Sequence, residues 1–134
     1  MDKKNRHATL LSLSAAMAPQ DRELMRQLGR QVTLWAFGCD PAPIDDPQLI
    51  NNVMEKYALE NRLTVRDRVI SEYEPQGVTV ALVLMESHIM ANSWPEHGVI
   101  QIEVFSCTDL DVQSLRRIAE DVFKSQRVYI FEMK

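Results

Sequence analysis

Apolar and polar residues alternate, or apolar residues run almost unbroken, along five segments of the chain, as they do in strands that bury a face. In the first segment, 31–37, Val32, Leu34 and Ala36 occupy alternate positions and share one side. The same reasoning predicts further strands at 63–74, 78–85, 98–105 and 128–133. Segment 78–85 is apolar on both faces, so we expect it to lie near the centre of a sheet.

Other segments show the spacing of helices. In 47–61 the apolar residues recur every three or four positions, and Asp46 is a suitable N-cap before the first helical residue. The segment 111–124 has the same spacing and predicts a second long helix. A shorter helix is expected to begin at Pro19 and to end at Gly29.

The order of these elements is βαββ followed by βαβ, which divides the chain into two βαβ-like halves. We predict an α+β fold, a two-layer α/β sandwich with an antiparallel sheet and its helices on one face. Residues 1–28 are expected to form a partly disordered N-terminal extension with a short helix, and 29–134 a single domain. The uncovered sheet face stays apolar in places, which favours dimerisation through the sheets.

Composition narrows the classes of function. The chain has 134 residues, enough for one domain, and a formal net charge of −4. That charge argues against a general binder of nucleic acid or anionic membranes, and no apolar run is long enough to cross a bilayer. Cys39 and Cys107 are too far apart to form a metal-type pair, so we expect no metal site. The apolar stretch at 8–13 is short for a signal peptide, so we expect a cytoplasmic protein.

Residues that can carry chemistry cluster after the strand at 78–85. That strand is expected to run into Glu86 and Ser87, and a polar turn with Trp94 and Glu96 follows. The sequence therefore predicts an acid, a hydroxyl and an aromatic side chain around one loop.

Three more residues extend this group. Cys107 ends the following strand, and Tyr73 stands just before a turn of the type Pro-Gln-Gly. Thr79 lies eight residues before Ser87, so on one continuous strand the two would share a face.

From about Gly29 to Glu132 the chain resembles the bacterial and archaeal S-adenosylmethionine decarboxylase proenzymes. No single motif carries the resemblance, but the ordered combination of six short motifs is highly specific. These motifs are Gly29-Arg30, Cys39-Asp40, Pro75-Gln76-Gly77-Val78, Glu86-Ser87-His88, Trp94-Pro95-Glu96 and Phe105-Ser106-Cys107.

The resemblance implies that the protein cuts its own chain between Glu86 and Ser87. The serine hydroxyl would attack the carbonyl of Glu86, the amide would become an ester, and β-elimination would break that ester. Residue 87 would then become a pyruvoyl group, a covalent cofactor made from the chain itself. Its ketone can form a Schiff base with a substrate amine and accept the electrons that remain when carbon dioxide leaves. The implied reaction is decarboxylation of S-adenosylmethionine for spermidine synthesis.

The resemblance also implies roles for other residues. Cys107 would donate the proton to the decarboxylated carbon, and Thr79 matches a serine whose hydroxyl assists self-cleavage. Glu96 would bind the ribose hydroxyls of the substrate, Tyr73 would stack on its adenine, and Trp94 would belong to the same substrate site. Members of the family form dimers or larger assemblies, so we expect at least a homodimer.

The sequence departs from the family most clearly at Asn92, which replaces a histidine that takes the proton driving ester elimination. An amide has no useful basicity near neutral pH, although we keep Asn92 among the candidate catalytic positions. Three hypotheses therefore stay open. The protein is a working S-adenosylmethionine decarboxylase that cleaves slowly or through another base, or a pyruvoyl-dependent arginine or ornithine decarboxylase of the same fold. Alternatively, it never cleaves and acts as the partner of an active paralogue.

Overall fold

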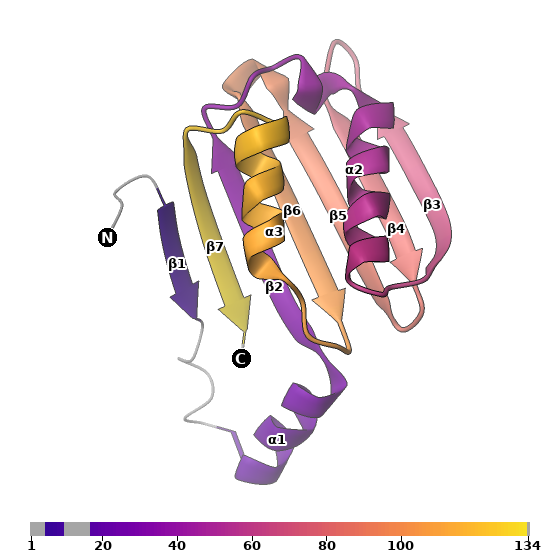
Figure 1. Cartoon of the computed structure of the whole chain (residues 1–134), viewed down its shortest axis with the longest axis vertical. Coiled ribbons are helices and arrows are strands. Elements are labelled where there is room, and N and C mark those ends of the chain that lie inside the picture. The colour runs from indigo at the N-terminus through magenta and orange to yellow at the C-terminus, as the bar shows by residue number, and fades with distance from the viewer. Residues whose placement is uncertain (1–4, 10–16, 134) are drawn as a thin grey trace.

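A computed structural model describes residues 5–9 and 17–133 as one sheet with helices (Figure 1). The elements are β1 (Asn5–Thr9), α1 (Pro19–Leu28), β2 (Arg30–Phe37), η2 (Pro43–Asp45), α2 (Pro47–Glu60), β3 (Val65–Glu72), β4 (Val78–Leu84), β5 (Ser87–Trp94), η3 (Pro95–His97), β6 (Val99–Ser106), α3 (Val112–Arg117), η4 (Ile118–Val122) and β7 (Arg127–Met133). The sheet has seven strands in the order β1-β7-β2-β6-β5-β4-β3.

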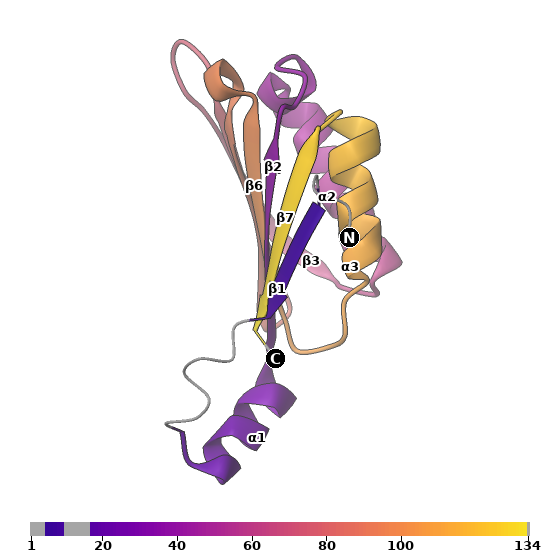
Figure 2. The same cartoon turned by 90° about the vertical axis from the view of Figure 1, so that its left-hand side faces the viewer.

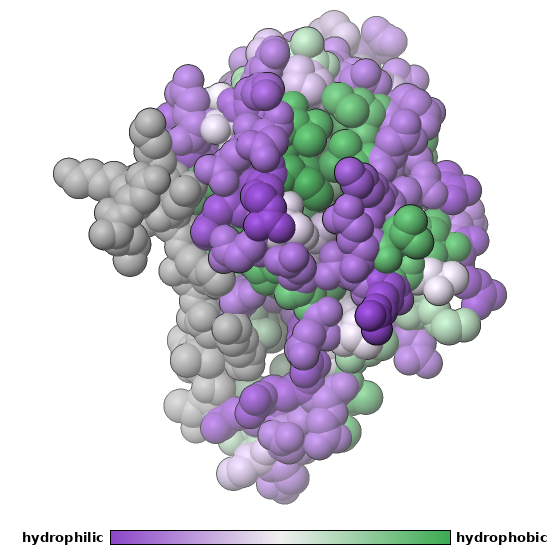
Figure 3. All heavy atoms as spheres, viewed as in Figure 1, coloured by the Kyte–Doolittle hydropathy of each residue, from purple (hydrophilic) through white to green (hydrophobic). Residues whose placement is uncertain are grey.

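The predicted two-layer sandwich is confirmed. Neighbouring strands are antiparallel throughout, except that β1 runs parallel to β7. Helices α2 and α3 lie on one face of the sheet, and no helix of the described residues covers the other face, which we call the open face (Figure 2). Figure 3 views the helix side, where hydrophilic side chains on the two helices flank a hydrophobic area between them.

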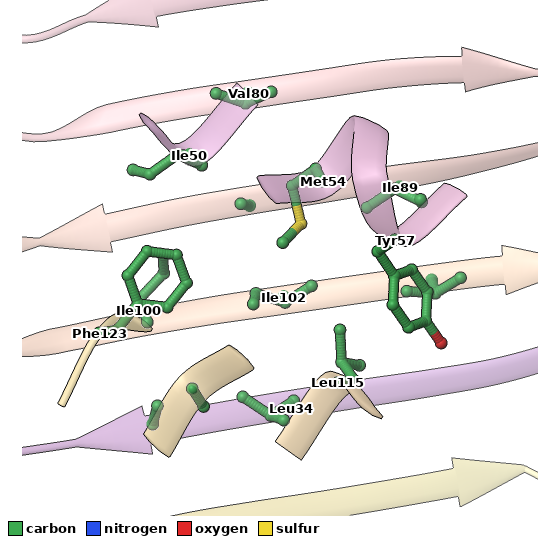
Figure 4. Packing of buried hydrophobic residues seen from close by; sticks show 14 of the residues in the cluster. Leu34, Ile50, Met54, Tyr57, Val80, Ile89, Ile100, Ile102, Leu115 and Phe123 are labelled. Atoms are coloured by element: carbon green, nitrogen blue, oxygen red, sulfur yellow. The ribbon is translucent and has the colours of Figure 1, made fainter. Parts of the chain in front are cut away.

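The core lies between the sheet and these two helices. Alternate residues of the central strands, including Leu34, Ile89 and Ile102, are fully buried beneath Met54 of α2 and Leu115 of α3 (Figure 4). This alternation is what the sequence pattern predicts, because successive side chains of a strand point to opposite faces.

The two helices that cover the sheet, α2 and α3, each begin after an aspartate N-cap. Asp46 accepts a hydrogen bond from the backbone N–H of Leu49 at 3.1 Å, and Asp111 accepts one from Ser114 at 3.0 Å. The two helices are joined by Tyr57 of α2, whose hydroxyl donates to the backbone carbonyl of Asp111 at 3.1 Å. These contacts fix the helices above the sheet and leave the open face free for a site.

Two segments differ from the sequence prediction. The polar stretch after residue 85 was expected to be a loop, whereas Ser87–Trp94 forms the interior strand β5, with Ile89 and Ala91 buried on the helix side. Residues 5–9 were expected to be poorly ordered, but they pair with β7 as an edge strand. The rest of that expectation concerns 1–4 and 10–16, which lie outside the described residues.

Candidate active site

A pocket of about 350 Å³ opens at the end of the sheet where β4 begins and β5 ends. Five of the predicted site residues line it, together with Gln76, Gly77 and Ser93. The five are Tyr73, Thr79, Asn92, Trp94 and Glu96. We call this the adenosyl-end pocket after its predicted ligand. Its aromatic side chains, Tyr73 and Trp94, are 52% and 37% exposed, so both present ring surface to a ligand.

A row of hydrogen-bonded side chains crosses the sheet beside this pocket. Thr79 Oγ1 donates to Asn92 Oδ1 at 2.7 Å, and Asn92 Nδ2 donates to Gln101 Oε1 at 3.2 Å. The hydroxyls of Tyr73 and Thr79 are 2.9 Å apart. Because Thr79 has one proton and gives it to Asn92, Tyr73 is the donor of that third bond. Asn92, in the centre of the row, therefore has both ends of its side-chain amide hydrogen-bonded. An amide also has no useful basicity, so this residue cannot act as a general base.

Two residues that shape the pocket were missed by the sequence analysis. Gln101 holds the amide of Asn92, as described above. Asp45 Oδ1 accepts a hydrogen bond from the backbone N–H of Gly77 at 2.9 Å, and Gly77 O accepts one from Tyr73 N at 2.9 Å. Gly77 has a φ of +108°, which glycine adopts without strain, so Asp45 secures the turn that carries Tyr73. Neither contact could be read from local spacing, because each joins residues on different elements.

The predicted cleavage site lies at the tight turn between β4 and β5. Glu86 has a φ of +60°, an uncommon conformation for a residue with a side chain. The Ser87 hydroxyl donates to the carbonyl oxygen of Met85 at 3.3 Å. Cys107 follows the last residue of β6 and is half-buried. The predicted scissile bond is thus in a turn, next to a residue with a strained backbone conformation.

The predicted site residues fall into two groups at opposite ends of β5. Thr79 pairs with Asn92 across β4 and β5, whereas Ser87 pairs with Leu84 at the turn. Asn92 lies five positions after Ser87 on the same strand, about 17 Å away at the rise of an extended chain. An odd separation also puts their side chains on opposite faces. The expectation that Thr79 and Ser87 share a strand and a face is wrong, because the turn at Met85 intervenes.

The two cysteines have different environments. Cys39 is buried, its Sγ lies 3.5 Å from the carbonyl oxygen of Ala36, and burial raises the pKa of its thiol to about 11. A buried thiol of that kind is protonated and unreactive, so Cys39 is structural and Cys107 is the candidate for chemistry.

Two general findings concern the part of the chain that the structure describes. Within it, no three side chains of His, Cys, Asp or Glu gather closely enough to hold a metal ion. None of its helices has the length and apolar character needed to traverse a bilayer.

Known proteins resemble this chain in sequence and fold. It is 35% identical over 85 residues to the S-adenosylmethionine decarboxylase proenzyme of Caldanaerobacter subterraneus, covering 63% of this chain and 68% of that protein. It is 31% identical over 109 residues to the proenzyme of Thermosipho africanus, covering 81% and 84%. The crystal structure of the adenosylmethionine decarboxylase from Aquifex aeolicus has the same fold, with a TM-score of 0.69 at 24% identity, over 81% of this chain and 90% of that one.

The sequence model of one family, described as S-adenosylmethionine decarboxylase, matches residues 30–134. This match covers all of the helices and strands described above except β1 and α1. The chain therefore belongs to the S-adenosylmethionine decarboxylase family.

Proposed function

We propose that the protein is an S-adenosylmethionine decarboxylase that makes its own pyruvoyl group by cleaving the bond between Glu86 and Ser87. The observation that supports this best is the adenosyl-end pocket. It combines an exposed aromatic ring, Tyr73, with an exposed carboxylate, Glu96, in a chain of this family. A carboxylate only accepts hydrogen bonds when ionised, so it suits the two hydroxyls of a ribose. The aromatic ring suits a planar base.

The cleavage step balances without an oxidant. Ser87 Oγ adds to the carbonyl carbon of Glu86, the C–N bond breaks, and the amine takes the hydroxyl proton. Loss of the Cα proton of residue 87 then expels the Glu86 carboxylate and leaves a carbon–carbon double bond. Water replaces the nitrogen of the resulting enamine, which releases ammonia and leaves a ketone. The products are chains 1–86 and 87–134.

The residues around position 87 fit the formation of such a group. The left-handed backbone of Glu86 is unfavourable for a residue with a Cβ by about 1 kcal/mol, and opening the chain there releases that strain. Bound at position 87, a pyruvoyl group supplies an electrophilic carbonyl that withdraws electrons from a substrate amine. Cys107, at the end of the neighbouring strand, is the group that would hold and deliver a proton there.

In this proposal each site is built from two copies of the chain. Ser87 and Cys107 lie at the turn end of β5. Asn92 is about 17 Å away along the strand, and the substrate-binding residue Trp94 lies farther still, at the other end of β5. In the proposed dimer, two copies pack against each other through their open faces. The two-fold axis runs between the two sheets and perpendicular to the strands, so the strands of the two copies run in opposite directions. The turn end of each copy then lies over the pocket of the other. The open face supports such an interface, because Val69, Val83 and Phe131 are exposed on it at 57%, 49% and 36%.

One observation favours a second candidate function. Asn92 is locked between Thr79 and Gln101 and cannot take a proton, so the elimination step lacks the base that the family's histidine supplies. A chain that stays whole would still offer its pocket to an active paralogue. In that case it acts as a partner that completes the site of the other subunit.

The activity test compares three substrates that carry a labelled carboxyl group. Purified protein is incubated with S-adenosylmethionine, arginine or ornithine, and the released carbon dioxide is counted. We expect release from S-adenosylmethionine alone, and Glu96→Gln should raise its KM. Release from arginine or ornithine instead would contradict the proposed substrate. No release from any of the three, in protein that remains one chain, would support the partner function.

A further inference from the structure

His88, the residue that follows the reactive serine, is held on the open face by two side chains of β6. Its imidazole stacks on the ring of Phe105, with centroids 5.8 Å apart and planes at 18°. Its Nε2 lies 3.7 Å from Oε1 of Glu103, at the distance of an ion pair when the imidazole is protonated. We call His88, Glu103 and Phe105 the β6 clamp.

The ring of Phe105 packs closely against the backbone at Gly29. A Cβ added to Gly29 would lie 2.2 Å from Phe105 Cζ, so the ring occupies the space that a side chain at position 29 would need. Gly29 has a φ of −166°, which any residue can adopt, so backbone conformation does not require glycine there. The close approach of the Phe105 ring does, because it leaves no room for a Cβ. Gly29, directly before β2, therefore packs against Phe105 of β6, which in turn stacks on His88 of β5.

The β6 clamp sits where it can set the position of residue 87. His88 pairs with Phe105 in the register of β5 and β6. One further step in that register places residue 87 level with Ser106, directly before Cys107. After cleavage residue 87 would begin a new chain, and a chain terminus frays unless side chains tie it down. The hydroxyl of Ser87, which bonds to the carbonyl oxygen of Met85, is lost in the proposed cleavage, so the clamp at His88 is the next side-chain contact along β5.

We infer that His88 is a positioning residue, which through the β6 clamp holds residue 87 beside Cys107 both in the whole chain and after cleavage. The part that concerns the cleaved chain rests on the proposed function, whereas the part that concerns the whole chain does not. His88 acts through Phe105 and Glu103 and takes no proton in this scheme. The alignment of the group at position 87 with the thiol of Cys107 depends on it.

Backbone amide exchange, followed by mass spectrometry of peptides that cover 87–92, tests the clamp directly. His88→Ala should make these amides exchange about three- to tenfold faster, the effect of losing one aromatic pair. His88→Phe keeps a stacking ring and should exchange at nearly the wild-type rate. Leu59→Ala is the control, because Leu59 is an exposed apolar residue of α2, on the helix side of the sheet and away from the clamp. Gly29→Ala should reproduce the His88→Ala result by displacing the ring of Phe105.

The inference would be overturned if the amides of wild type and His88→Ala exchange at the same rate. It would also be overturned if the amides of His88→Phe exchange as fast as those of His88→Ala. In cleaved protein, His88→Ala should lower kcat by about 10- to 100-fold and leave KM unchanged, because misplacement of a reacting group costs rate while the pocket is intact. A raised KM with unchanged kcat would also contradict it. If the chain never cleaves, the proposed function fails, but the exchange comparison on the whole chain still decides whether the clamp exists.

Discussion

Mixed dimers of two inactive variants should recover activity, because in the proposed arrangement each site combines the turn end of one copy with the pocket of the other. Ser87→Ala removes the source of the pyruvoyl group but leaves the adenosyl-end pocket intact. Glu96→Gln damages that pocket and leaves the cleavage site intact. In a heterodimer with the proposed arrangement, the turn end of the Glu96→Gln copy lies over the intact pocket of the Ser87→Ala copy, so one of the two sites is complete.

The separation along β5 sets the size of this effect. Ser87 and Asn92 are about 17 Å apart in one chain, far beyond the reach of a side chain, so neither variant can rescue itself. Each purified heterodimer should therefore show about half of the wild-type rate, since one of its two symmetric sites is intact. An equal mixture that exchanges subunits freely should show about a quarter, because half of its dimers are mixed.

The assay uses co-expression with two different affinity tags, so that sequential purification isolates the heterodimer. Carbon dioxide release from S-adenosylmethionine is then compared with that of both homodimers, with wild type carrying the same tags as the control. Activity near half of wild type would agree with the composite site. A heterodimer as inactive as its parents, although it contains one cleaved chain, would refute the reasoning from strand geometry.

Three further predictions follow from individual contacts. Asn92→His restores a base, so cleavage into two chains should become faster than in wild type on a denaturing gel; an unchanged rate would show that position 92 is not limiting. Tyr57→Phe removes the hydrogen bond to the carbonyl of Asp111 and should lower the free energy of unfolding by about 1 kcal/mol in urea; no loss would mean that this bond contributes nothing net. Because burial raises the pKa of Cys39 to about 11, a thiol reagent at pH 8 should label Cys107 first in the folded protein, and both cysteines in denaturant.

Much of the sheet could be predicted because its buried residues alternate without interruption. Val32, Leu34 and Ala36 lie in β2 as expected, and α2 begins at the predicted cap. Strand β5 was missed because Asn92 and its polar neighbours obscured the alternation of Ile89 with Ala91. The turn before it also has no glycine or asparagine at its left-handed position, which is the usual sequence mark of a two-residue hairpin.

The site was predictable only in part. The resemblance to the family named the residues that line the pocket, and the structure brings them together. It did not show that Ser87 and Cys107 stand at the opposite end, because that depends on the register of a strand read as a loop. Asp45 and Gln101 were missed for another reason. Their roles arise from contacts between distant parts of the chain, which local spacing does not record.

The central claim is that the chain cuts itself between Glu86 and Ser87, and intact-mass spectrometry of the purified, denatured protein tests it most directly. The account predicts two species, one ending at Glu86 and one beginning at position 87 with a pyruvoyl cap. A single mass for the whole chain of 134 residues, unchanged after long incubation, would contradict the claim. It would favour the second candidate function, in which the chain stays whole and acts as the partner of an active paralogue.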